Sequence, residues 1–469
     1  MKRFCLGVVL VGLVFVGGCV VMVGPWPTYG PSPMEQLDNY QTAIVLVDER
    51  IAQNNFTDTP GRFQAGWAAV EMELPIGIPL AGYGNRGGAP STGVHDPLFV
   101  KALAVSDGVD TAIIVGSDML VVSDNIAHPV RDRVSAETGI DGNNILFNAS
   151  HTHSGPGGAM EGLLANLFAG PYDARVPELA IDTFSRAIIA AHANLAPARI
   201  ANGKVDAPEH IRNRARSGGG TDPSLRFLVV EQDSGERCIV VRYSAHSTVI
   251  GGSNMEFSGD YPGYLQRIMT EETGAECIFL AGAMGSMSAS NTGDGDGFQR
   301  AENLGRSLVE RILPALDGLV FEDSVDVASV GAPIYFPSYQ IRLNKSLRLS
   351  PKLPPYAGIG DEAWVQAVRM GDIVLVGMPA DYSGELAVGM SRWADAVLDI
   401  DLWMNSFSGS YVGYVSPDEY YFDPWDLEDA KAREDAIYEI QVMSWTGPQQ
   451  EAIFDGLAKH MARGLMGAN

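Results

Sequence analysis

Two histidines, His151 and His153, are the side chains best suited to chemistry in this 469-residue sequence. They follow a short apolar run, residues 145–147, and precede a Ser-Gly-Pro-Gly-Gly loop that cannot continue a regular element. In an extended segment residues two apart point to the same side, so both imidazoles are expected to face one cleft. Neutral imidazole is a common zinc ligand and its pKa lies near working pH. One ring could therefore hold a metal while the other moves protons; two partly exposed loop histidines are the alternative.

Three further predicted strand ends carry polar side chains. These are His246 after residues 238–244, Asp381 with Glu385 after residues 373–376, and Tyr411 with Tyr414 after residues 398–404. Converging strand ends are where α/β proteins place ligands. Two histidines, a carboxylate and an open position form a catalytic zinc set, because zinc accepts nitrogen and oxygen donors and needs a position for water. The two tyrosines, three residues apart, could equally be packing aromatics.

The elements that must position these side chains alternate between strand and helix. A strand at 111–120, a helix to about residue 138 and the strand before His151 give a β-α-β order. Residues 78–103 are expected to form a long loop rich in glycine and proline. Later segments predict a helix at 177–194, a hairpin of residues 225–231 and 238–244, and helices at 264–273 and 300–316. We predict an α/β fold in which a mixed β-sheet core is flanked by helices, in one large domain with its site at strand ends.

The N-terminus is typical of an export signal. Lys2 and Arg3 precede an almost wholly apolar segment, residues 4–18, and Val-Gly-Gly-Cys19 resembles the lipobox of bacterial lipoproteins. Cleavage before Cys19 would leave that cysteine to be lipidated, and several acyl chains anchor a protein far better than one. An uncleaved signal anchor is the alternative, since residues 4–24 are about long enough to span a bilayer.

We therefore expect an exported protein, lipid-anchored at a bacterial envelope membrane on the periplasmic face or at the outer membrane. Its expected segments are a signal peptide (1–18), a Pro/Gly-rich tether (19–33), an N-terminal helical segment (34–65) and the main domain (66–469). Cys238 and Cys277 could pair in an oxidising compartment or be two buried small hydrophobes.

Composition excludes one class of partner. The formal charge of −25 becomes −27 when Lys2 and Arg3 leave with the signal peptide. A polyanion would be repelled at long range and no basic stripe is present, so nucleic acid is not an expected partner.

Several motifs occur in a fixed order along the chain: HTHSGPGG at 151–158, Asn213-Arg214, AHST at 245–248 followed by SGDYPGY at 258–264, and YVGY at 411–414. Together they resemble the neutral/alkaline non-lysosomal ceramidase family from about residue 66 to residue 464. The resemblance implies a ceramidase-like catalytic domain in a divergent member. The chain stops near the end of the catalytic region, so we expect no C-terminal immunoglobulin-like domain.

The resemblance also implies roles for single residues. Zinc would be held by His151, His246, Asp381 and Tyr414. His153 would be the acid/base, Arg214 would face the substrate, and Ser288 would match the serine of the family's Gly-Asp-x-Ser motif. In the mechanism that we expect, Arg214 and one of the two tyrosines would stabilise the oxyanion, and Tyr411 is counted with Arg214 among the candidate catalytic residues.

Three departures leave alternatives open. Pro-Ala-Asp381 replaces the family's Pro-Gly-Glu, so Glu385 could be the ligand instead. Gly-Ser-Met-Ser288 replaces Gly-Asp-x-Ser, which leaves a direct role for Ser288 open. Arg214 could simply pair with an acid such as Asp222.

The resulting hypothesis is a zinc-dependent amidohydrolase of an N-acyl lipid, with ceramide, cleaved to sphingosine and fatty acid, as the expected substrate. Zinc would lower the pKa of a bound water, and His153 would take its proton and return it to the leaving amine. The alternatives are a zinc hydrolase of another N-acyl amide and a surface lipoprotein that binds lipid without catalysis.

Overall fold

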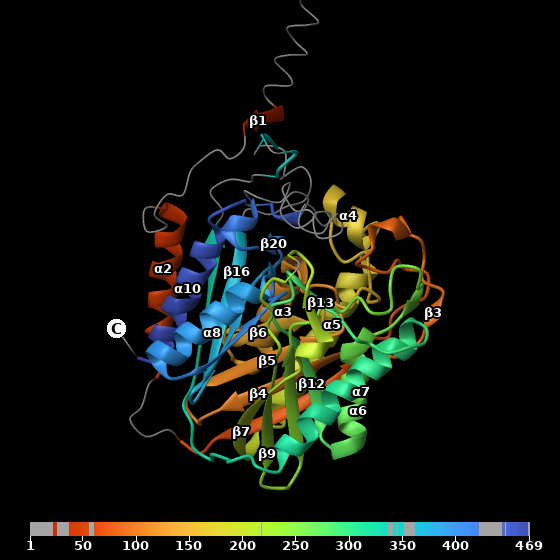
Figure 1. The fold of residues 1–469 in the computed structure, drawn as a ribbon. Helices are drawn as coiled ribbons and strands as arrows, with labels where there is room; N and C mark the ends of the chain where they lie inside the picture. Colours follow the sequence, from red (N-terminus) through yellow and green to blue (C-terminus); the bar gives the residue numbers. More distant parts are fainter. Residues whose placement is uncertain are drawn as a thin grey trace, which may run out of the picture.

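The protein is built in four layers, helices–sheet–sheet–helices (Figure 1). The computed structural model describes residues 22–25, 37–55, 61–335, 341–350, 362–421 and 443–467, apart from residues 217, 345 and 446. The expected signal peptide, Cys19 and nearly all of the tether therefore lie outside the described residues. No helix within those described ranges is both long and apolar enough to cross a bilayer.

The larger sheet has eight strands in the order β12-β10-β9-β7-β2-β4-β5-β6. Most neighbours are antiparallel, but β5 runs parallel to β6 and β10 runs parallel to β12. The strands are β2 (Gln64–Glu71), β4 (Phe99–Ser106), β5 (Thr111–Ser117), β6 (Ile145–Ala149), β7 (Ala196–Asp206), β9 (Ser224–Gln232), β10 (Arg237–Tyr243) and β12 (Glu276–Ala281). The predicted mixed sheet, the β-α-β order and the β9–β10 hairpin are confirmed.

The smaller sheet has the order β14-β16-β17-β19 and packs face to face on the larger one. Its strands are β14 (Val327–Tyr335), β16 (Glu362–Met370), β17 (Ile373–Gly377) and β19 (Asp401–Asn405), and β17 runs parallel to β19. Apolar side chains of both sheets form one buried core, with Leu103, Ile114 and Leu228 on one side and Leu375 and Trp403 on the other. Each sheet is thus buried on both faces, which suits its nearly continuous apolar strands.

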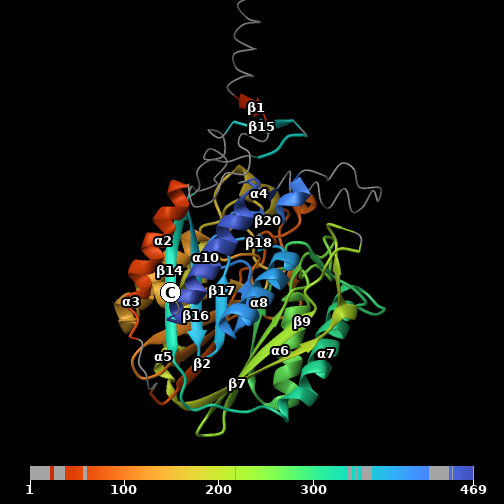
Figure 2. The same ribbon diagram turned by 60° about the vertical axis from the view of Figure 1, so that its left-hand side comes forward.

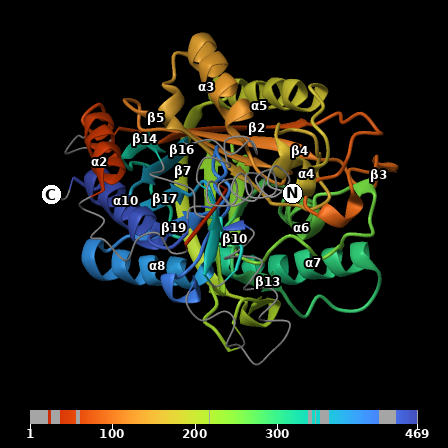
Figure 3. The same cartoon turned by 90° about the horizontal axis from the view of Figure 1, so that it is seen from above.

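Helices cover the outer face of each sheet (Figures 2 and 3). The larger sheet is covered by α3 (Asp124–Thr138), α5 (Arg175–Ala193), α6 (Asp260–Thr273) and α7 (Gly297–Leu316). The smaller sheet is covered by α2 (Asp38–Ile51), α8 (Gly384–Leu398) and α10 (Gln450–Leu465). The helix expected from the N-terminal segment thus packs on β14 and α10.

Two sequence expectations about elements were wrong. Residues 99–103, expected in a loop, belong to the central strand β4, where the buried Lys101 interrupts the apolar pattern and bonds to Glu276 and the Cys277 carbonyl. The expected strand 398–404 begins instead at Asp401, because Leu398 ends helix α8. Cys238 and Cys277 are free and buried, in apolar clusters on opposite faces of the sheet, so they do not pair.

Candidate metal centre

Five strands have their carboxyl ends at one end of the two sheets: β6, β10, β12, β17 and β19. The side chain of Asn148 joins three of them, β6, β12 and β19, by hydrogen bonds. Its side chain lies fully buried on β6 and exchanges hydrogen bonds with both backbone groups of Ala281, at the end of β12. Its amide also donates to the carbonyl oxygen of Ser406, just after β19 (2.8 Å). A buried amide with its donors and acceptor satisfied fixes the relative position of the strands that it joins.

Three imidazoles converge where these strands end. The Nε2 atoms of His151 and His246 lie 3.0 Å apart, and those of His151 and His153 lie 3.2 Å apart. One ring nitrogen from each of the three lies within 4.8 Å of the others. His151 and His153 face one site, as predicted. The expected cause, an extended segment that turns both rings to the same side, was wrong. Strand β6 ends at Ala149, and His151 has a left-handed backbone with φ of 60°, so a turn rather than an extended segment aims the two rings.

The hydrogen bonds of the buried rings leave their Nε2 atoms as acceptors. His151 donates from Nδ1 to the carbonyl oxygen of Leu120 (2.7 Å), and His246 donates from Nδ1 to that of Met284 (3.1 Å). Burial lowers the pKa of His151 to about 3 and holds the pKa of His153 and His246 well below the ordinary value. All three rings are therefore neutral at pH 7 with a lone pair available.

Asp381 supplies a carboxylate to the same place. Its Oδ1 atom lies 3.7 Å from Nε2 of His151 and, although buried, has no hydrogen-bond partner among the described residues. Its Oδ2 atom accepts from the Tyr411 hydroxyl (2.6 Å), and Tyr414 is hydrogen-bonded to the same carboxyl group. Tyr414 is placed by the short strand β20 (Tyr414–Val415), which pairs with β18 (Asp381–Tyr382) so that Asp381 and Tyr414 are directly opposite. Burial raises the pKa of Asp381 to about 7. The two tyrosine hydrogen bonds and the charge of Arg214 lower this pKa, but by less than burial raises it.

These groups fit a zinc ion. Two nitrogens that bind one zinc ion tetrahedrally lie roughly 3.3 Å apart, close to the 3.0 Å observed between the Nε2 atoms of His151 and His246. An orphaned buried carboxylate oxygen beside neutral imidazole lone pairs is costly without a cation. The Nδ1–carbonyl hydrogen bonds of His151 and His246 are the outer contacts that orient histidine ligands.

The other candidate residues divide into those beside the cluster and those away from it. Arg214 donates to the Tyr414 hydroxyl and to the Gly285 carbonyl (2.8 Å each), so it reaches the site and does not pair with Asp222. Asp222 instead forms a buried pair with Arg242 (2.6 Å).

Glu385 and Ser288 lie outside the cluster. The Glu385 carboxylate is occupied by Asn213, Ser286 and Tyr420, so Asp381 is the carboxylate that faces the imidazoles. Ser288 lies on β13 (Met287–Ala289) directly opposite Arg212 on β8 (Ile211–Asn213), and no hydrogen bond joins it to the histidines among the described residues.

Sequence reasoning missed the groups that fix His153. The buried Arg86 guanidinium donates to the carbonyl oxygens of Ala81 (2.7 Å) and His153 (2.6 Å). The Tyr83 ring meets the His153 ring edge-on, with 4.8 Å between their centres. Gly82 packs so closely on His153 that an added Cβ would lie 2.4 Å from its Cγ. The glycine-rich loop was visible in the sequence, but nothing in it indicated a contact about 70 residues away.

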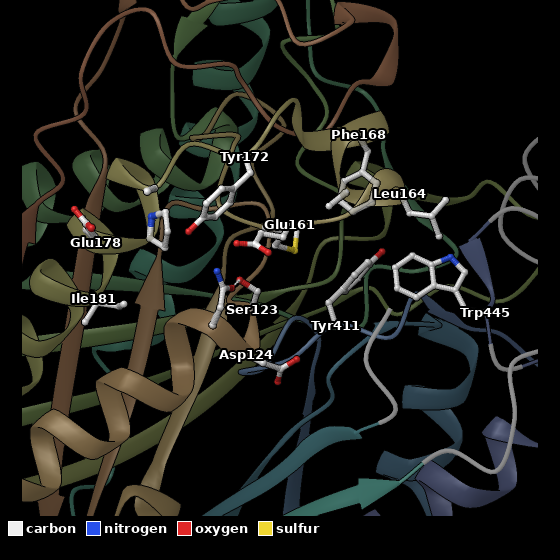
Figure 4. A pocket seen from close by; sticks show the side chains of 15 residues that line it. Ser123, Asp124, Glu161, Leu164, Phe168, Tyr172, Glu178, Ile181, Tyr411 and Trp445 are labelled. Atoms are coloured by element: carbon white, nitrogen blue, oxygen red, sulfur yellow. Dashed lines mark hydrogen bonds between the residues drawn. The ribbon is translucent and has the colours of Figure 1, made fainter. Parts of the chain in front are cut away.

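Two cavities flank the cluster. One, of about 830 Å³, is lined by His153, His246, Arg214 and Tyr414. The other, of about 580 Å³, lies on the side of Tyr411 (Figure 4). Figure 4 shows Tyr411 and Trp445 beside Leu164 and Phe168 along one wall of this second cavity. Leu164 and Phe168 belong to α4 (Leu163–Ala169), whose Leu163 and Leu167 are 66% and 60% exposed.

Comparison with known proteins gives a consistent result. Residues 73–297 match the family model described as neutral/alkaline non-lysosomal ceramidase, N-terminal. The neutral ceramidase of Pseudomonas aeruginosa is 25% identical over 240 residues, which cover 48% of this chain and 36% of that protein. The neutral ceramidase of Mycobacterium tuberculosis is 25% identical over 237 residues, covering 46% and 37%. The matched regions thus span about a third of these relatives.

The fold of this chain is also similar to that of the Pseudomonas aeruginosa protein. A crystal structure of the Pseudomonas aeruginosa neutral ceramidase superimposes with a TM-score of 0.73 at 20% identity, covering 88% of this chain and 75% of that one. The likeness extends well beyond the residues that the family model matches.

Proposed function

Through residues 73–297 this chain is related to the neutral/alkaline non-lysosomal ceramidases, and from that relationship we propose that it is a zinc-dependent hydrolase of the amide bond in an N-acyl lipid. The observation that carries the proposal is the convergence of three neutral imidazoles and an orphaned carboxylate oxygen at the ends of buried strands. Ceramide, cleaved to sphingosine and fatty acid, is the proposed reference substrate, because the curated relatives are neutral ceramidases.

We assign the metal to His151, His246 and Asp381, with Tyr414 completing the set. A zinc ion bound there would supply Lewis acidity, lowering the pKa of a water molecule and polarising the amide carbonyl. His151 does not line the open cavity, whereas His153 and His246 do, so substrate approaches from the His153 side.

His153 is the proposed proton carrier. Its ring is half-buried, and its Nε2 lies 3.2 Å from Nε2 of His151. Because its pKa is held low by burial and by the neighbouring charges, it enters the reaction neutral and can accept a proton at Nε2. It then returns that proton to the departing amine nitrogen.

Arg214, beside the metal ligand Tyr414, is placed to hold the negative charge that develops on the amide oxygen. The two side chains are joined by a hydrogen bond and both line the cavity with His153. Removing one such donor typically costs about 3 kcal/mol of transition-state stabilisation. Tyr411 has a different role in this proposal: it holds Asp381 in orientation through its hydroxyl.

Apolar surfaces near the site support a lipid substrate. The second cavity offers Leu164, Phe168 and Trp445 as walls for a hydrocarbon chain, and the exposed Leu163 and Leu167 adjoin it on α4. The export signal and lipidation of Cys19, inferred from the sequence, would hold the protein at a membrane surface where such substrates occur.

Zinc analysis together with turnover tests the proposal. The purified full chain should contain about one zinc per molecule and hydrolyse a short fluorescent ceramide, and a chelator should abolish turnover until zinc is restored. His151→Ala should lose both zinc and turnover, whereas His153→Ala should keep zinc and lose turnover. If the protein binds the ceramide but does not bind zinc and does not hydrolyse the ceramide, it is a lipid-binding module and the proposal fails.

A further inference from the structure

The cavity over His153 and His246 is basic in an otherwise acidic protein. The chain has 57 acidic and 32 basic residues, yet this cavity is lined by Arg212, Arg214 and Arg300 and by no aspartate or glutamate of the described residues. The local charge therefore opposes that of the whole molecule. Such a concentration of one sign in a cleft attracts a ligand of the opposite sign.

The backbone aims two of these arginines at the cavity. Arg212 lies on β8 and Arg214 directly follows that strand, two residues on, so both can face the same side. Backbone pairing of β8 with β13 places Ser288 opposite Arg212 and fixes the register. Arg300 comes from a different element, the first turns of α7.

Arg212 and Arg300 differ from most arginines of this protein in having no carboxylate partner within the described ranges. Arg300 donates to the carbonyl oxygens of Gly295 (2.8 Å) and Val249 (3.5 Å) only, and Arg212 is exposed with no hydrogen bond from its guanidinium to any described residue. By contrast, most exposed arginines elsewhere are paired with acids, among them Arg62, Arg133, Arg175, Arg199, Arg237 and Arg306. Arg392 and Arg463 also have no carboxylate partner among the described residues, but neither lines this cavity. Guanidinium groups left without a counter-ion beside a catalytic cluster are suited to bind a carboxylate or phosphate.

The remaining wall is mixed. Asn85, Thr248, Ser288 and Thr292 contribute amide and hydroxyl groups, and Val249 and Ala289 are its aliphatic side chains. With three arginines beside these polar groups, the cavity favours a polar, charged part of a substrate, whereas Leu164, Phe168 and Trp445 give the cavity beside Tyr411 a wall for a hydrocarbon chain.

We propose that the substrate is an anionic N-acyl amide, whose carboxylate or phosphate group, carried on the amine side, is bound by Arg212 and Arg300. The inference rests on the proposed hydrolysis and names its substrate class. Water adds across the amide, the C–N bond breaks, and the products are a fatty acid and an amine that carries the anionic group. The two sources of that group are an N-acyl amino acid and a phosphorylated N-acyl sphingoid base.

Two matched substrate pairs test this on the zinc-loaded full chain. The first pair is N-dodecanoyl-phenylalanine and its neutral C-terminal amide; the second is a short-chain ceramide 1-phosphate and the same ceramide without phosphate. The anionic member of at least one pair should have a kcat/KM about 10- to 100-fold higher, as expected for charge-assisted hydrogen bonds. The pair that shows the difference identifies the source of the anion, and added salt should reduce it.

Variants locate the effect. Arg212→Gln and Arg300→Gln should each remove most of the preference while leaving turnover of the neutral member, and Arg212→Lys should keep part of it. Arg306→Gln, on the outer surface of the same helix α7 and paired with Glu302, should leave both members unchanged. Melting temperatures identify any variant that fails to fold. The effect of salt on the preference for the anionic substrate is measured on the unaltered protein, so this test does not depend on any variant.

Failure of this inference can be distinguished from failure of the proposed amide hydrolysis. Equal hydrolysis of charged and neutral members, unaffected by Arg212→Gln or by salt, overturns this inference and leaves the proposed amide hydrolysis standing. Absence of hydrolysis of all four compounds by zinc-loaded protein overturns both.

Discussion

Gly82→Ala tests whether the packing around His153 controls catalysis. A Cβ at position 82 would lie 2.4 Å from Cγ, 2.5 Å from Nδ1 and 2.6 Å from Cβ of His153. The methyl group cannot be accommodated at these distances. The ring would have to move by about 1 Å, and a displacement of that size in a catalytic group costs about 100-fold in rate. We therefore expect kcat/KM for the short fluorescent ceramide to fall about 100-fold, with zinc content retained.

The substitution also strains the backbone, and a second glycine separates the two effects. Gly82 has φ of 100°, which is unfavourable for alanine by about 1–2 kcal/mol. Gly77 has nearly the same φ, 102°, but nothing lies within 4 Å of its added Cβ. Gly77→Ala should therefore show the loss of unfolding free energy without the loss of activity.

A double-mutant cycle completes the test. In the His153→Ala background the ring that Gly82→Ala displaces is absent, so adding Gly82→Ala should lower the residual kcat/KM less than about 3-fold. The reasoning is refuted if Gly82→Ala and Gly77→Ala have the same kcat/KM, or if Gly82→Ala costs as much without His153 as with it.

Three further predictions concern the groups around the cluster. Tyr411→Phe removes the 2.6 Å hydrogen bond to Asp381, so zinc affinity measured by chelator competition should fall about 10- to 100-fold; unchanged affinity with lost turnover would assign Tyr411 to the substrate instead. Asp222→Asn leaves the buried Arg242 without its partner and should lower the unfolding free energy by about 3–5 kcal/mol in urea, against less than about 1 kcal/mol for the exposed pair broken by Arg306→Gln. Burial raises the pKa of Asp118 from 3.8 to about 6, so its neutral form favours the folded state, and that stabilisation is complete below pH 3.8 and lost as pH rises through 6. Asp118→Asn should therefore flatten the fall in unfolding free energy between pH 4 and 7, by up to about 3 kcal/mol, and an unaltered pH profile would contradict the assignment.

Much of the sheet framework followed from the sequence because its signals are local. The apolar runs before His151 and His246 and the hairpin turn between β9 and β10 mark elements that their own residues determine. Strand β4 was not predicted because Lys101 lies buried in the middle of the strand. The partners of Lys101, Glu276 and Cys277, are about 175 residues away in the sequence. No local pattern could show that this lysine is satisfied inside the protein.

The site shows the same division between local and distant information. Residue type and order indicated His151, His246 and Asp381, since strand ends deliver each of them to the same edge. Which of Asp381 and Glu385 faces the imidazoles can be seen only in the structure, where the Glu385 carboxylate is hydrogen-bonded to Asn213, Ser286 and Tyr420. The left-handed backbone of His151 was likewise not predictable, because few residues other than glycine adopt a positive φ.

The most direct test of the proposed metal site is an anomalous-difference map from crystals of the zinc-loaded protein, recorded at the zinc absorption edge. We expect one dominant peak about 2.0–2.2 Å from Nε2 of His151, Nε2 of His246 and Oδ1 of Asp381. A zinc peak elsewhere in the molecule, or none in protein that hydrolyses the amide, would contradict it.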